Sequence, residues 1–123
     1  ASPDTVRAMT PEMFFDYLAV HINGQKAGDA KSVFNIDLGN DGGKYKLELE
    51  NGVLNHTANA EAKDADATIT LSRDTLNKII LKEMTLKQAQ DNGDVKIAGD
   101  GAKLDTMLGY MDKFDFWFNI VTP

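Results

Sequence analysis

Apolar and polar residues alternate along three consecutive segments in the first half of the chain: residues 32–38 (SVFNIDL), 44–50 (KYKLELE) and 53–57 (VLNHT). A period of two residues is typical of strands that bury one face and leave the other in water. The dipeptide Asn51-Gly52 separates the second and third segments, and this pair is the strongest short signal for a β-hairpin. Two further strands are expected at residues 67–71 and 94–98, where apolar side chains again alternate.

A period of three to four residues indicates helices before, between and after these strands. Thr10-Pro11 has the residue types of a helix start, and Asn23-Gly24 has those of a helix end. Ser72 begins a second helix, residues 85–93 form a weak helical segment, and Gly99-Asp100 precedes the last helix. The expected apolar faces are Phe14, Tyr17, Leu18, His21 and Ile22 in the first helix, Leu76, Ile79 and Ile80 in the second, and Leu104, Met107, Leu108 and Met111 in the last.

The resulting element order, α-β-β-β-β-α-α-β-α, predicts the fold class. We expect one α+β domain over residues 1–123, with a five-stranded, mostly antiparallel sheet covered on one face by helices. The length suffices for one hydrophobic core, and the chain has no cysteine with which to form a disulfide.

Charge and composition exclude two classes of function. The formal net charge is −6, and no basic stripe is present that would neutralise phosphates, so nucleic-acid binding is not expected. No apolar run approaches the ~20 residues that a membrane-spanning helix needs.

The residue types that perform catalysis or bind metals are not grouped in this sequence. His21 and His56 are far apart, whereas a catalytic zinc site usually has three protein ligands. Ser72 is explained as a helix cap, and residues 99–103 (GDGAK) lack the ending of a phosphate-binding loop. We therefore predict no catalytic residue, no metal site and no cofactor in this chain.

Residues 66–83 (DATITLSRDTLNKIILKE) and 93–104 (GDVKIAGDGAKL) resemble the second half of the sterol carrier protein type two (SCP-2-like) domain. This resemblance implies a five-stranded sheet covered by helices, with an apolar tunnel between the two layers. In the family's lipid carriers the spacer between these stretches is apolar and aromatic, whereas residues 87–92 here (KQAQDN) are polar.

Residues 47–56 (LELENGVLNH), 64–73 (DADATITLSR) and 114–123 (FDFWFNIVTP) are together similar to the C-terminal domain of bacterial alkyl sulfatases. The resemblance implies that residues 1–123 are the C-terminal piece of a larger enzyme. A metallo-β-lactamase-type zinc domain would come first in that enzyme and a helical dimerisation domain second. The zinc and its histidine cluster would belong to the first domain. The sequence does not fix the compartment, although a periplasmic or secreted parent enzyme is favoured.

The resemblance also implies a non-catalytic role, namely an apolar surface or cavity for an alkyl sulfate or fatty acyl chain, or packing against the catalytic and dimerisation domains. A stand-alone carrier of lipids or sterols and a structural assembly domain are the alternatives. The side chains expected in the ligand pocket or core are Met13, Phe14, Tyr17, Leu76, Ile80, Met84, Met107, Leu108 and Met111. The aromatic tail is expected to dock on its own domain or on a neighbouring one through Phe114, Phe116, Trp117 and Phe118.

Overall fold

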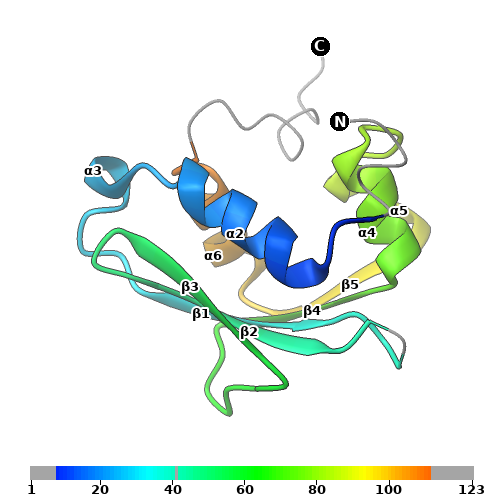
Figure 1. Cartoon of the computed structure of the whole chain (residues 1–123), viewed down its shortest axis with the longest axis horizontal. Coiled ribbons are helices and arrows are strands. Elements are labelled where there is room, and N and C mark those ends of the chain that lie inside the picture. Colours follow the sequence, from blue (N-terminus) through cyan, green and yellow to red (C-terminus); the bar gives the residue numbers. More distant parts are fainter. Residues whose placement is uncertain (1–7, 41, 112–123) are drawn as a thin grey trace.

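The computed structural model describes residues 8–40 and 42–111, and in it a sheet lies against a layer of helices (Figure 1). The strands are β1 (Ser32–Asp37), β2 (Lys44–Glu50), β3 (Val53–Ala58), β4 (Ala67–Leu71) and β5 (Val95–Gly99). Their order across the sheet is β3-β2-β1-β4-β5. The β1–β4 pair is parallel and the other three pairs are antiparallel, which confirms the expected α+β class.

The described helices are α2 (Pro11–His21), α3 (Gly24–Ala27), α4 (Arg73–Ile80), α5 (Leu86–Asn92) and α6 (Gly101–Leu108). The hydroxyl of Thr10 caps α2, that of Ser72 caps α4, and Thr85 and Gln88 form a reciprocal capping box on α5. The predicted helix starts are therefore confirmed. The short helix α3 was not expected, because Asn23 was interpreted only as the end of α2, whereas its side chain also accepts a hydrogen bond from the Lys26 amide.

The Asn51-Gly52 turn joins β2 to β3 as the sequence predicts. Asn51 has a φ of 53° and Gly52 a φ of 76°, so both central residues are left-handed, as a tight hairpin turn requires. A Cβ placed on Gly52 would also lie 3.0 Å from the Cα of Gly24. The turn therefore needs glycine for its backbone angle and for its close approach to α3.

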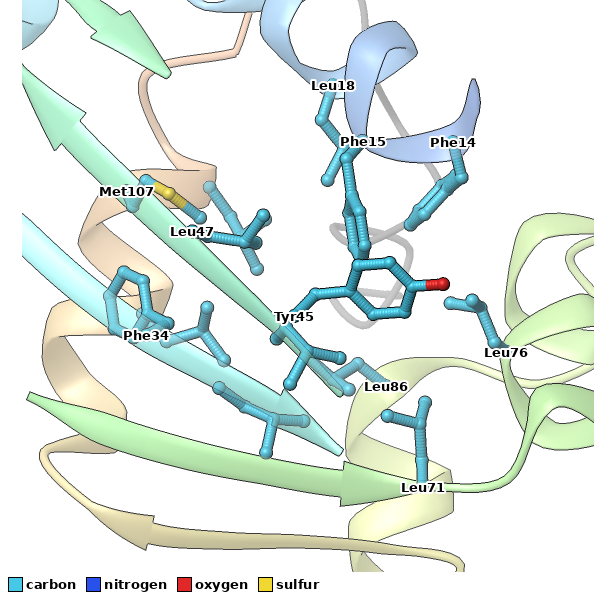
Figure 2. Packing of buried hydrophobic residues seen from close by; sticks show 14 of the residues in the cluster. Phe14, Phe15, Leu18, Phe34, Tyr45, Leu47, Leu71, Leu76, Leu86 and Met107 are labelled. Carbon is cyan, nitrogen blue, oxygen red and sulfur yellow. The ribbon is translucent and has the colours of Figure 1, made fainter. Parts of the chain in front are cut away.

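The alternation within the strands places one apolar face of the sheet under the helices (Figure 2). On the central strand β1, Phe34 is paired with Leu47 on one side and with Ala67 on the other. Ile36 is flanked in the same way by Tyr45 and Ile69. All of these side chains are buried, so the centre of the sheet forms the floor of the core.

The other face of the sheet is polar and is crossed by residues 59–66, here called the crossover loop, which connects β3 to β4. The side-chain amide of Asn35 donates to the Ala62 carbonyl at 2.9 Å and accepts from the Ala62 amide at 2.8 Å. Asp66 closes the loop: its carboxylate accepts from the Val33 amide at 2.8 Å, and its other oxygen lies 3.1 Å from Lys103 Nζ. These polar contacts attach the loop to β1 and α6.

Candidate functional site

An apolar cavity of about 50 Å³ lies between the helices and the sheet. Every residue that lines it is apolar: Phe14, Phe15 and Leu18 from α2, Ile36, Leu47, Ile69 and Leu71 from the strands, Leu76 from α4, Leu86 from α5, and Leu104, Met107 and Leu108 from α6. Figure 2 shows several of these side chains converging from α2, α4, α6 and the sheet. Among the described residues no hydrogen-bonding side chain lines this space, so its lining suits a hydrocarbon.

The volume limits what the cavity can contain in this conformation. A water molecule takes up ~30 Å³ in the liquid, and pockets for drug-sized ligands measure ~300–1,000 Å³. Within the described part of the chain, this cavity has room for one or two methylene groups. It is a small cavity rather than the open tunnel that the SCP-2-like resemblance implies. A longer alkyl chain would enter only if one of the lining elements moved.

Helix α2 forms one wall of the cavity and is attached to the β2–β3 edge of the sheet. Asp16 Oδ1 lies 2.7 Å from His56 Nε2 on β3. The Phe15 ring packs edge-on against Tyr45, with ring centroids 5.1 Å apart, and tilted against His56 at 5.8 Å. One acid–base contact and a small group of rings therefore hold α2 against these two strands.

A second polar contact joins α2 to β2. The Tyr45 hydroxyl lies 3.5 Å from Glu12 Oε1. Burial raises the pKa of Tyr45, and the negative charge of Glu12 raises it further. A tyrosine hydroxyl is protonated at neutral pH even without this shift, so it is able to donate a hydrogen bond to the Glu12 carboxylate.

Four of the nine side chains expected in the pocket or core line this cavity: Phe14, Leu76, Met107 and Leu108. Ile80, the last residue of α4, is buried in the core, and Met84 is partly buried against the core. Met111 is buried where its backbone forms an antiparallel bridge with Ile22. The predicted tail contacts, Phe114, Phe116, Trp117 and Phe118, lie outside the described residues.

The expectation that Met13 and Tyr17 belong to the pocket or core is wrong. Their exposed fractions are 52% and 40%, because α2 turns Phe14, Phe15 and Leu18 towards the sheet instead. Phe15 was missed, although it is only 2% exposed and lies in the cavity wall. Apolar residues occur around most of α2, so the sequence period does not identify its buried side.

The described residues contain no group of three or more His, Cys, Asp or Glu side chains able to hold a metal ion. His56 is paired with Asp16, and the His21 ring packs against the Tyr17 ring with centroids 4.6 Å apart. Neither histidine therefore belongs to a group of candidate metal ligands among the described residues. None of the described helices is long and apolar enough to cross a membrane.

The chain is similar to several sulfatases over nearly its whole length. It is 54% identical over 123 residues to a linear primary-alkylsulfatase of Pseudomonas sp. and 39% identical over 120 residues to an (R)-specific secondary-alkylsulfatase of Pseudomonas sp.. It spans 18% of the length of each of these relatives. The chain thus corresponds to one part of each of these longer relatives.

Two solved structures have the same fold as this chain. A stereoselective inverting sec-alkylsulfatase from Pseudomonas sp. matches 95% of this chain and 18% of its own with a TM-score of 0.79 and 37% identity. The palmitated SCP2L2 domain of Aedes aegypti matches 86% of this chain and all of its own with a TM-score of 0.63 and 17% identity, which shows a common fold. The model of the family described as alkyl sulfatase C-terminal matches residues 1–123, and the chain belongs to this family.

Proposed function

We propose that this domain holds the alkyl chain of the substrate in an alkyl sulfatase, while another domain of the same enzyme performs the hydrolysis. The observation that supports this most is the wholly apolar lining of the cavity between α2 and the sheet. An alkyl sulfate has a charged head and a tail of which each buried methylene contributes ~0.8 kcal/mol. A lining without polar groups cannot donate hydrogen bonds to a sulfate, so the domain would bind the alkyl tail of the substrate rather than its head.

The cavity would have to expand to accept such a tail, and α2 is the element best suited to move. It supplies Phe14, Phe15 and Leu18 to the lining, yet it is not a strand of the sheet and shares none of the ladder hydrogen bonds. Moving α2 away from α4 and α6 would widen the space without breaking the sheet. Met107, on the opposite wall, is unbranched and flexible and would adapt to tails of different shape.

The relatives support the same assignment. Proteins named alkylsulfatases contain this segment, and the Aedes aegypti domain with the same fold was solved in a palmitated form. The described residues offer no metal-ligand group, so we expect the zinc chemistry implied by the sulfatase resemblance to be in a different domain. The domain would then contribute affinity and chain-length preference rather than reacting groups.

Methyl NMR of the methionine-labelled chain tests the proposal, because Met107 lines the cavity and Met13 lies on the outer side of α2. The probe is decyl sulfate, kept below the concentration at which it forms micelles. We expect a saturable change at the Met107 methyl signal and little change at Met13. A matched pair of variants sharpens the test: Leu76→Phe fills the cavity and should weaken the response, whereas Val53→Phe adds the same ring on the exposed edge strand and should not.

Two outcomes would contradict the proposal. A change at Met13 without one at Met107 would mean that the detergent adheres to the surface of α2. No saturable change at either methyl group would leave the domain without a ligand of this class and would favour a purely structural role in assembly.

A further inference from the structure

The outward side of α2 carries apolar side chains that the described fold leaves at the surface. Met13, Tyr17 and Val20 have exposed fractions of 52%, 40% and 80%. Because these positions follow the spacing i, i+4, i+7, they lie on one side of the helix, roughly opposite the buried Phe15. We call them the outer stripe of α2. A row of apolar side chains on a helix in a chain of net charge −6 is typical of a contact surface.

The C-terminal end of the described chain lies beside the end of this helix. The Asn23 amide donates to the Tyr110 carbonyl at 2.7 Å, and Ile22 forms a backbone bridge with Met111. Met111, the last described residue, therefore lies beside the end of α2. The described part of the chain thus ends near one end of the outer stripe.

The sequence that follows is suited to an apolar surface. Residues 112–123 read DKFDFWFNIVTP, and from position 114 onward they contain one charged residue, Asp115. Their large apolar residues are Phe114, Phe116, Trp117, Phe118, Ile120 and Val121. Twelve residues reach ~40 Å when extended, whereas the eleven residues of α2 span ~16 Å, so the segment is long enough to pass along the whole helix.

We propose that residues 112–123 dock along α2 and cover the outer stripe. Docking would remove apolar surface from water on both partners, and this segment is tethered beside the stripe, so it needs no association from solution. The segment would then press on the helix that forms the outer wall of the cavity. The proposal does not depend on the binding of an alkyl chain.

Fluorescence of the 123-residue chain tests this directly, because Trp117 is its only tryptophan. We expect a blue-shifted emission that acrylamide quenches weakly. Val20→Lys places a charge in the stripe at a position that is 80% exposed, so the helix itself should tolerate it. In this variant the emission should shift to the red and the acrylamide quenching constant should rise several-fold. Met13→Lys is the second variant, with the same expected change.

Val53→Lys is the matched control, because Val53 is also exposed, at 53%, but lies on β3 rather than on α2. It should leave the Trp117 emission unchanged, and circular dichroism should show that all three variants are folded. A Trp117 that is fully quenchable in the native chain would overturn the proposal, even if it became protected in a longer sulfatase. Protection that survives both α2 variants, or that disappears on dilution, would equally rule out docking on the chain's own helix.

Discussion

The two faces of the sheet are stabilised in different ways. Under the helices, Phe34, Leu49 and Ile79 have exposed fractions of 0–1%, and the contacts are between apolar side chains. Such burial contributes roughly 25 cal/mol per Å² and has no preferred direction. On the opposite face the stabilising contacts are a few hydrogen bonds of defined geometry, centred on Asn35 and Asp66.

This difference predicts different responses to mutation. On the helix-covered face, shape and volume matter, and another apolar side chain of similar size is expected to be tolerated. On the polar face, the identity of the donor or acceptor matters more than the volume. The experiments below test this contrast in order of decreasing expected effect.

The largest effect is expected for Phe34→Ala. Phe34 is 0% exposed, so its removal should lower the free energy of unfolding by ~3–5 kcal/mol, whereas Phe34→Leu should cost clearly less. Urea unfolding followed by circular dichroism measures both values. Equal losses for the two variants would mean that an aromatic ring, rather than apolar volume, is required at the centre of the sheet.

The next effect is expected for Asn35→Ala on the polar face. This change leaves the amide and carbonyl of Ala62 without their side-chain partner and should cost about 2 kcal/mol. Asn55→Ala is the matched control, because Asn55 is an exposed asparagine on β3, and it should change the stability by less than ~0.5 kcal/mol. If both substitutions cost the same, the crossover loop is not held by Asn35.

Asp66→Asn should cost about 1 kcal/mol at pH 7, because the asparagine can still accept from the Val33 amide but loses the charge that faces Lys103. The Val33 amide lowers the pKa of Asp66 most strongly, burial opposes this, and Lys103 lowers it further. The stabilisation is therefore present above the pKa that Asp66 has in the unfolded chain, and it is lost as the pH falls through the lower pKa of the folded state.

Chemical unfolding of both proteins between pH 7 and pH 2 measures this dependence. The stability of the wild-type chain should converge on that of Asp66→Asn in acid. A difference that stays constant over the whole range would show that the charge of Asp66 does not contribute.

The smallest effect is expected for the ion pair between Lys44 and Glu61, whose Nζ and Oε1 atoms are 3.5 Å apart. Both side chains are about half exposed, so Glu61→Ala should change the stability by less than ~0.5 kcal/mol, and 1 M salt should abolish the difference. A larger, salt-resistant loss would indicate that the crossover loop depends on this pair as well as on Asn35.

The strands could be predicted from the sequence because each strand repeats a simple alternation over several residues. Tyr45, Leu47 and Leu49 are buried and Lys44 and Glu50 are exposed, as the period of two predicts. The helix caps were equally local signals. The order of the strands, and the parallel pairing of β1 with β4, depends on contacts between distant segments and was not predicted.

The buried side of α2 could not be predicted, because Met13, Phe14, Phe15, Tyr17 and Val20 surround the helix axis with apolar groups. The side of α2 that faces the sheet is decided by contacts between separate segments, such as that between Asp16 and His56. The contacts of Asp66 could not be predicted for the same reason. It lies in an acidic run that is typical of a solvated loop, and its partners are 33 and 37 residues away.

The parallel β1–β4 ladder divides the molecule into two continuous halves. Residues 8–58 contain the strands on one side of this ladder, β1, β2 and β3, and residues 67–111 contain the strands on the other side, β4 and β5. A peptide bond cut in the crossover loop would therefore leave each half with its own hydrogen-bonded strand pairs. Two separately produced fragments are expected to reassemble along β1 and β4, and the recovery of the folded state on mixing would report on that ladder together with the backbone contacts between the end of α2 and residues 110–111.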